Sequence, residues 1–222
     1  MRFWPVATIV FGVATFAVLV AFSLLPAVRA GFPLGDFIPA MSAFQRAVTP
    51  ADLTYVFGSP ADPARIAAMQ NANTLDLYGF IPIYTLFLIS GAAMLAGGVR
   101  KPVAWLSFAP ALIGAAGDLV ETTKQLGVTS DWAHAGSYLP IAFACWIKYF
   151  GLAVSAAGAS ALCLAGPKPR FVLAGLGFVP IIATAADFLH VAHVPSLLSI
   201  GFAAFWLPLL VVAIRESLSR AS

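Results

Sequence analysis

Six long runs of apolar residues, separated by more polar segments, dominate the pattern along this chain of 222 residues. A helix that crosses the hydrocarbon core of a bilayer needs about 20 such residues. The pattern therefore predicts an all-α fold, an integral membrane bundle of about six transmembrane helices. We place the spans at residues 5–28, 78–98, 103–121, 139–165, 171–191 and 196–214, with the last two the least clearly separated.

The composition supports a membrane protein. Hydrophobic residues make up 61% of the chain and charged residues only 9%, a balance that ordinary water-soluble domains do not show. We expect residues 1–222 to form a single membrane domain, with residues 30–77 as an extracytoplasmic segment. The net charge of +3 is not concentrated on one basic face, so nucleic acid is not an expected partner. The expected partners are the lipid bilayer and a lipid or small amphiphile.

The basic residues orient the predicted spans, because cytoplasmic loops are enriched in Lys and Arg. If the spans alternate in direction, one side should be the cytoplasm, with both termini inside. The alternative for the first span is a cleaved signal peptide, but its apolar run exceeds the usual length of about 7 to 15 residues. The basic residues on the predicted cytoplasmic side are Arg2, Arg100, Lys101, Lys168, Arg170, Arg215 and Arg220.

Residues 30–77 are the only sizeable part of the chain predicted to lie outside the membrane. Thr49 followed by Pro50 indicates a helix that begins at the proline, and residues 59–60 indicate a second start. We expect short helices on the outer membrane surface, as amphipathic segments form. An equally open alternative is a small cap packed on the bundle. The aromatic residues expected in the membrane interface are Phe37, Phe44, Tyr55 and Phe57.

A weak internal repeat relates residues 95–121 to residues 164–190. Each stretch carries Leu-Ala-Gly followed by Phe, Pro, Ala and Asp at similar spacing, and Glu121 then aligns with His190. Repeats in membrane proteins often place a binding site between their halves. The sequence thus suggests a parallel repeat of two helical hairpins, although Ala- and Gly-rich helices also resemble one another by chance.

Lys148 lies within the apolar residues 139–166. A charged residue at the centre of a spanning helix costs about 2.5 to 3.5 kcal/mol, so the amine needs a partner. Asp118 and Glu121 share one helical face near the predicted outer end of the third span, where the helix dipole disfavours negative charge. Lys148 would lie about 14 Å below the outer surface and Asp118 about 5 to 8 Å below it, a difference that an extended Lys side chain can close. We predict that Lys148 pairs with Asp118 or Asp187.

Asp187, His190 and His193 recur every three residues near the predicted outer end of the fifth span. Carboxylate and imidazole groups of this kind are ligands for zinc and other divalent metals, and His134 in the neighbouring loop could add a ligand. A divalent metal is therefore a candidate cofactor. The alternative is that these histidines are only polar caps near the membrane surface.

Asp76 precedes the predicted second span, where an acidic side chain stabilises a helix N-terminus. Because Asp76 falls on the same side as the other carboxylates, it could instead complete the rim of a polar cavity. Tyr149, next to Lys148, could supply a hydroxyl group to such a cavity.

Three short motifs stand out between residues 57 and 121: FGSP at residues 57–60, LDLYGFIPIY at 75–84 and GDLVE at 117–121. Together with the Lys at 148, they resemble a family of bacterial polytopic inner-membrane proteins of no assigned function. The resemblance covers residues 50–150, and Thr122 stands where the pattern has Asn. It implies that Asp76, Asp118, Glu121 and Lys148 belong together and that the chain lies in the bacterial inner membrane.

The preferred hypothesis is a multi-pass membrane protein that binds a small or amphiphilic ligand, an ion or a proton in an outward-facing polar cavity. Phosphate loops, dinucleotide fingerprints and hydrolase nucleophile elbows are absent from the sequence. A membrane-embedded lipid hydrolase or isomerase, with or without a metal, is one alternative. A structural or assembly subunit is the other. The expected cavity residues are Asp118, Glu121, Lys148, Asp187 and His190.

Overall fold

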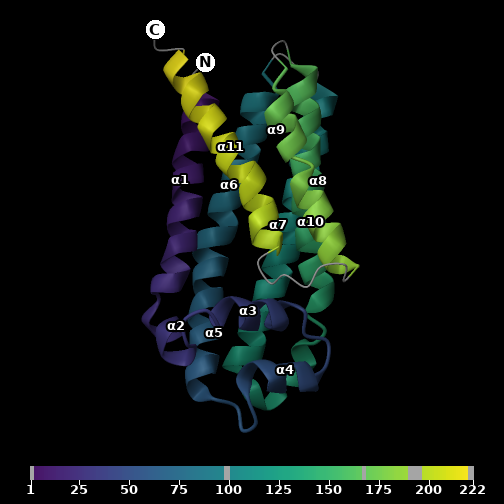
Figure 1. The fold of residues 1–222 in the computed structure, drawn as a ribbon. Helices are drawn as coiled ribbons and strands as arrows, with labels where there is room; N and C mark the ends of the chain where they lie inside the picture. Colours follow the sequence, from purple (N-terminus) through teal and green to yellow (C-terminus); the bar gives the residue numbers. More distant parts are fainter. Residues whose placement is uncertain (1–2, 98–100, 167–168, 190–196, 220–222) are drawn as a thin grey trace. The chain divides into compact units, whose positions relative to one another are not determined.

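The computed structural model describes residues 3–97, 101–166, 169–189 and 197–219, and these residues are helical nearly throughout (Figure 1). No β-strand occurs among them. In chain order the helices are α1 (Phe3–Leu24), α2 (Pro26–Gly31), α3 (Phe37–Gln45), α4 (Pro50–Phe57), α5 (Pro63–Leu75), the π-helix η1 (Asp76–Phe80), α6 (Ile81–Leu95), α7 (Lys101–Ser130), the 3₁₀ helix η2 (Trp132–Tyr138), α8 (Ala142–Ala165), α9 (Phe171–Leu176), α10 (Val179–Phe188) and α11 (Leu197–Ser219).

Among the described residues, six helical segments are long and apolar enough to cross a bilayer, which confirms the predicted class of an all-α membrane bundle. They are Phe3–Gly31, Pro63–Leu95, Val103–Ser130, Ala142–Ala165, Phe171–Phe188 and Leu197–Ser219. The second begins 15 residues before the predicted start at 78, and the third ends nine residues after the predicted end at 121. Polar sequence therefore continues both helices beyond the length that a bilayer requires.

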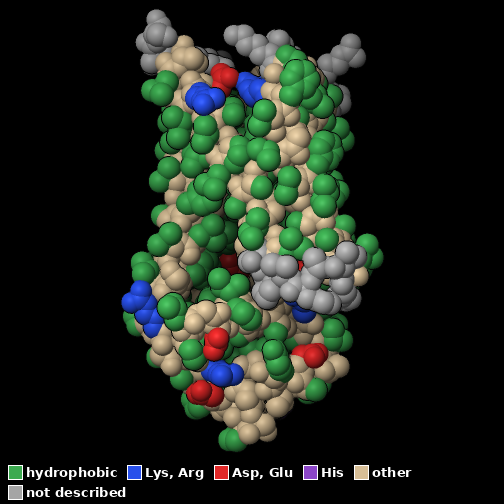
Figure 2. Space-filling model, in the orientation of Figure 1, with side chains coloured by type: hydrophobic (Ala, Val, Ile, Leu, Met, Phe, Trp, Pro, Cys, Tyr) green, Lys and Arg blue, Asp and Glu red, His purple; other side chains and the backbone are tan. Residues whose placement is uncertain are grey.

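Apolar side chains on the outer faces of these helices are exposed. Val10, Val20 and Ile182 are each more than half exposed, as expected of side chains that contact lipid rather than water. Where Figure 2 shows the surface of α1 and α11, it is covered by apolar side chains, and charged side chains gather near the end where α11 finishes.

The chain divides into two compact units, each built from several stretches of sequence. The first comprises Met1–Thr15, Ile83–Ala115 and Tyr149–Ser222, and the second comprises Phe16–Pro82 and Ala116–Lys148. In the first unit, Gly12 of α1 lies against Phe87 of α6 and Leu210 of α11. The beginning of α1 and the end of α11 lie at the same end of this unit (Figure 1).

Helices α7 and α8 run through both units, and small residues bring their first-unit parts into close contact. A Cβ atom on Gly158 would collide with the backbone oxygen of Leu106, and a Cβ on Gly151 would meet the backbone nitrogen of Gly114 at 2.5 Å. Ser107 and Ser155 exchange hydroxyl-to-carbonyl hydrogen bonds of 3.0 and 2.9 Å across the same contact. Close approach through small residues is a common way for helices to pack in membranes.

The second unit carries a cap, by which we mean α2, α3, α4, α5 and η2. The cap has its own apolar core, in which the Phe44 and Phe57 rings meet edge to face at 5.0 Å and both side chains are fully buried. For Phe44 and Phe57 the prediction that the rings dip into the membrane interface is therefore wrong, and their burial favours the equally open alternative of a small packed cap. Tyr55 is exposed, and Phe37 packs against Phe32 at the edge of the core.

Helix starts in the cap follow local capping chemistry. Helix α4 begins at Pro50 after Thr49, as predicted. The Asp52 carboxylate accepts hydrogen bonds from the backbone N–H groups of Val48 and Thr49, at 2.9 and 2.8 Å. These bonds hold the pKa of Asp52 below its usual value of 3.8. Helix α5 begins at Pro63 rather than at residue 60, because the Asp62 carboxylate accepts from the Ala64 N–H at 2.8 Å and caps the helix there.

The two predicted hairpins differ in one visible respect. Helix α7 is continuous, whereas its predicted counterpart is broken into α9 and α10 near Gly177. The internal repeat stays a prediction.

Candidate functional site

An ion-pair cluster joins α7 to α8 in the second unit. The Nζ atom of Lys148 lies 3.1 Å from Oδ1 of Asp118 and 2.7 Å from Oε2 of Glu121. The three side chains are no more than 7% exposed. The predicted pairing of Lys148 with Asp118 is confirmed, and Glu121 is a second partner.

The backbone of α8 approaches α7 closely at this point. A Cβ atom added to Gly117 would lie 2.6 Å from the backbone nitrogen of Lys148 and 3.1 Å from the backbone oxygen of Ala144. Only glycine leaves room for this contact without moving the main chain. Asp118 follows Gly117 in the sequence, so this close helix contact brings the Asp118 carboxylate within 3.1 Å of the Lys148 Nζ atom.

A second contact joins α7 to the helical segment that begins in α5. The Thr122 hydroxyl donates a 2.7 Å hydrogen bond to Oδ2 of Asp76, and the Gln125 amide donates a 3.3 Å bond to Oε1 of Glu121. Asp76 also interacts electrostatically with Asp118, Glu121 and Lys148. The residues predicted from the family resemblance to belong together therefore do lie together.

The structure corrects the expected role of Asp76 as a helix cap. Leu75, Asp76 and Ile81 all have right-handed helical dihedral angles, and α5 continues through η1 into α6 without a break. Asp76 is the first residue of the π-helical turn, and its backbone carbonyl oxygen accepts a hydrogen bond from the N–H of Ile81. A carboxylate inside a continuous helix has no free backbone N–H groups at hand, so it pairs with Thr122 of another helix. Single π-helical turns occur frequently at functional sites.

Asp118 and Glu121 do not sit at the end of their helix either. Helix α7 continues for nine residues after Glu121, about 14 Å, so the expected penalty from the helix dipole does not apply. Lys148 lies six residues after the start of α8, about 9 Å along the helix. The cluster therefore lies where apolar sequence gives way to polar sequence in α7, rather than in the middle of an apolar span.

The charges of the cluster do not balance. Among the described residues, three carboxyl groups, on Asp76, Asp118 and Glu121, lie with one ammonium group, that of Lys148. Full ionisation would leave an excess of two negative charges among side chains that are mostly buried. Uncompensated buried charge is strongly unfavourable. Asp76 is the least buried of the four, since part of its surface is accessible while the others are enclosed.

Asn73 adds a second imbalance one turn before Asp76. Residues three apart share a helical face, and Asn73 is 1% exposed. Within the described residues its Nδ2 atom has no hydrogen-bond acceptor. Buried donors of this kind are normally satisfied by protein or by ordered water.

The remaining predicted site residues are Tyr149, Asp187, His190 and His193. Tyr149 begins the next stretch of the first unit, where its ring packs on Phe202 at 6.1 Å. Asp187 lies on α10 of the first unit. His190 and His193 lie outside the described residues. Among the residues that are described, no three His, Cys, Asp or Glu side chains are grouped to hold a metal ion, and the exposed His134 pairs with Asp131 at 3.0 Å.

Sequence reasoning missed Thr122 and Gln125 as members of the cluster. Both lie four residues after a carboxylate of the cluster, Asp118 or Glu121, and so share its helical face. This spacing was a usable signal. Both residues follow residue 121, the predicted end of the third span.

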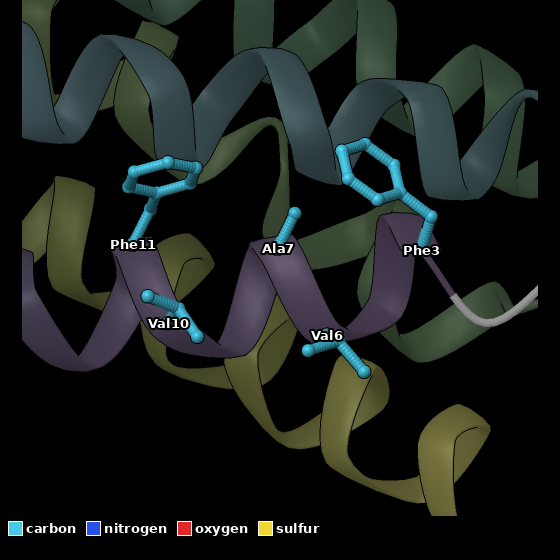
Figure 3. Close-up of a pocket in the computed structure, with 5 residues that line it drawn as sticks. All are labelled: Phe3, Val6, Ala7, Val10 and Phe11. Carbon is cyan, nitrogen blue, oxygen red and sulfur yellow. The ribbon is translucent and has the colours of Figure 1, made fainter.

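A different hollow lies on the surface of α1 in the first unit (Figure 3). Its volume is about 430 Å³, and all the side chains that line it are apolar. Such a lining suits lipid acyl chains and offers no polar chemistry. Phe3, Ala7 and Phe11 point from one side of the helix, and Val6 and Val10 from another.

Comparisons of the chain with models of protein families, with curated protein sequences and with solved structures find no match in any of the three. Fold and site together define a multi-pass helical membrane protein with a buried cluster of ionisable side chains.

Proposed function

We propose that this protein binds a positively charged ligand, a proton or a small cation, at the cluster of Asp76, Asp118, Glu121 and Lys148. The observation that carries the proposal is the charge imbalance. Within the described part of the cluster, the one positive charge of Lys148 stands against three carboxyl groups. A bound positive charge would remove most of the cost of burying them.

The contacts of Lys148 favour a cation over an anionic ligand. The sequence also allowed an anionic lipid headgroup held by the ammonium group as a point charge. In the structure two carboxylates already contact that ammonium group, at 2.7 and 3.1 Å. An anionic headgroup would have to displace one of them and would add to the excess negative charge.

Thermal stability of the purified protein tests the proposal, because a ligand that binds only the folded state raises the melting temperature with its concentration. The melting temperature should rise with added Na⁺, K⁺ or Ca²⁺, or with falling pH near neutrality. In Glu121→Gln, which removes one carboxylate, this response should be much smaller. Asp131→Asn is the matched control, because Asp131 is an exposed carboxylate that pairs with His134. Identical responses in the parent and in Glu121→Gln would refute the proposal.

We further propose that the protein lies in the bacterial inner membrane, with both termini in the cytoplasm and the cap outside. The common location of the beginning of α1 and the end of α11 within the first unit supports termini on one side. So does the Arg170–Glu216 ion pair, which brings two of the basic positions, Arg170 and Arg215, to one end of that unit. The family resemblance supports the choice of membrane.

Cysteine labelling in intact cells tests this orientation. A membrane-impermeant maleimide should label Tyr55→Cys in the cap but label Ser219→Cys only after lysis. The two native cysteines, Cys145 and Cys163, are buried and should contribute little background. Labelling of Ser219→Cys in intact cells would reverse the proposed orientation.

A structural role is the second candidate, because the close contact at Gly117 and the Lys148 pairs together fix the register of α7 against α8. Under this role Lys148→Met would lower thermal stability while the response to cations or protons stayed the same. The enzyme alternative stays a prediction, since two of its three proposed metal ligands lie outside the described residues.

A further inference from the structure

We propose that the ligand of this cluster is a proton, carried chiefly by Asp76 and delivered by a water molecule that the buried amide of Asn73 holds in place. This inference rests on the proposed function and names the ligand of the same site.

The position of Lys148 argues against a metal cation on the inner carboxylates. Its ammonium group contacts both Asp118 and Glu121. A metal ion on either carboxylate would lie within a few ångströms of that ammonium group, and the repulsion would oppose binding. A proton needs no coordination shell and adds no bulk, so it can neutralise the excess charge within the packing that is present.

Asp76 is the carboxyl group best placed to carry the proton. In the described part of the chain, the ion pairs of Lys148 are with Asp118 and Glu121, and no such pair joins it to Asp76. Its Oδ2 atom accepts the Thr122 hydrogen bond, which leaves Oδ1 to carry a hydrogen. Asp76 is also partly accessible, whereas Asp118 and Glu121 are enclosed. We therefore place the entry of the proton at Asp76.

Asn73 supplies the independent evidence for an occupant beside Asp76. An amide donor that is 99% enclosed and has no acceptor among the described residues costs free energy unless an oxygen atom lies next to it. A water molecule placed there would accept from Asn73 and could exchange a proton with the carboxyl group one turn away. Among the described residues, the other charged or titratable groups that act on this region are Asp118 and Glu121 of α7, Lys148 and Cys145 of α8, and Arg46, which follows α3.

Infrared spectroscopy of the purified protein tests the proposal, because a protonated carboxyl group has a carbonyl stretch that a carboxylate lacks. The parent should show this band at neutral pH, and Asp76→Asn should lose it, whereas Asp131→Asn should keep it. Transfer into D₂O should shift the band quickly in the parent and at least tenfold more slowly in Asn73→Leu. Asn71→Leu is the matched control, because Asn71 lies on the same helix but is exposed and donates to its own backbone.

Thr122→Val provides a second variant should Asp76→Asn fail to fold. Loss of the Thr122 hydrogen bond should shift the band of the parent without abolishing it. A band that survives in Asp76→Asn and disappears in Asp118→Asn or Glu121→Gln would overturn the assignment to Asp76. If the parent shows no band but Na⁺ or Ca²⁺ raises its melting temperature, the assignment of the ligand as a proton is wrong and the proposed binding of a cation holds. If the parent shows neither the band nor stabilisation by a cation, the assignment and the proposed function both fail.

Discussion

The ammonium group of Lys148 lies between two carboxylates one helical turn apart on α7, 3.1 Å from Asp118 and 2.7 Å from Glu121. One side chain of α8 thereby fixes both the rotation and the depth of that helix against α7. Because all three side chains are buried, each charge depends on the others for compensation.

Lys148→Met should lower the free energy of unfolding by about 3 to 5 kcal/mol, because it leaves two buried carboxylates without their counter-ion. The double variant Lys148→Met with Glu121→Gln should recover part of the loss, since one of the orphaned charges is removed as well. Thermal denaturation in detergent, followed by circular dichroism, measures both. Lys124→Met is the control: Lys124 donates to the Pro140 carbonyl near the surface and should cost less than about 1 kcal/mol. Equal melting temperatures for the parent and Lys148→Met would contradict this account of the cluster.

Gly117→Ala should destabilise the protein by about 1 to 3 kcal/mol, as overpacking of a tight contact typically does. The new methyl group would meet the backbone nitrogen of Lys148 at 2.6 Å, and a backbone atom within a helix cannot turn aside as a side chain can. Gly175→Ala is the matched control, because nothing lies within 4 Å of its added Cβ. It should be neutral or stabilising by up to about 1 kcal/mol, since Ala favours helix over Gly. If the two variants have equal stability, the contact is looser than the structure shows.

The six apolar helices were predictable from sequence because hydropathy measures the transfer of side chains into lipid, which decides where a span occurs. The pairing of Lys148 with Asp118 was predictable for a related reason, since few carboxylates lie within reach of a buried amine. Hydropathy says nothing about where a helical backbone stops. Residues 63–75 are polar but rich in good helix formers such as Ala, Arg, Met and Gln, so α5 joins α6, and Asp76 becomes an internal residue.

The fate of the aromatic residues in the cap could not be read from sequence. A short amphipathic helix presents the same apolar stripe whether lipid or protein covers it. Phe44 and Phe57 face each other only because α3 and α4 pack together, and such a contact between separate elements leaves no local signal. Thr122 and Gln125 were not predicted as members of the cluster because both follow residue 121, where the third span was expected to end. Their contacts with Asp76 and Glu121 depend on the continuation of α7 past that point.

Phe57→Ala should unfold the cap locally and cost about 3 to 5 kcal/mol, the usual range for removing a buried Phe side chain. Phe57 is fully enclosed and packs on both Phe44 and Trp132, at 5.0 and 5.1 Å. Amide hydrogen exchange read by mass spectrometry should show faster exchange throughout α3 and α4. Tyr55→Ala, on the same helix but 78% exposed, should leave that exchange nearly unchanged. Protection of α3 and α4 that survives in Phe57→Ala would show that the cap does not depend on this core.

Asp52→Asn should weaken the start of α4 in a pH-dependent way. The carboxylate accepts two backbone hydrogen bonds, and these hold the pKa of Asp52 below 3.8 in the folded cap. A group with a depressed pKa stabilises the folded state fully above its unfolded value and loses that contribution as the pH falls through its folded value. In neutral solution the variant should therefore be less stable than the parent, by less than about 1 kcal/mol because water screens so exposed a group. The difference should vanish well below pH 3.8. Protection factors for the α4 amides in both proteins, corrected for intrinsic exchange at each pH, measure it. A gap that stays constant or widens on acidification would contradict the role of the ionised carboxylate.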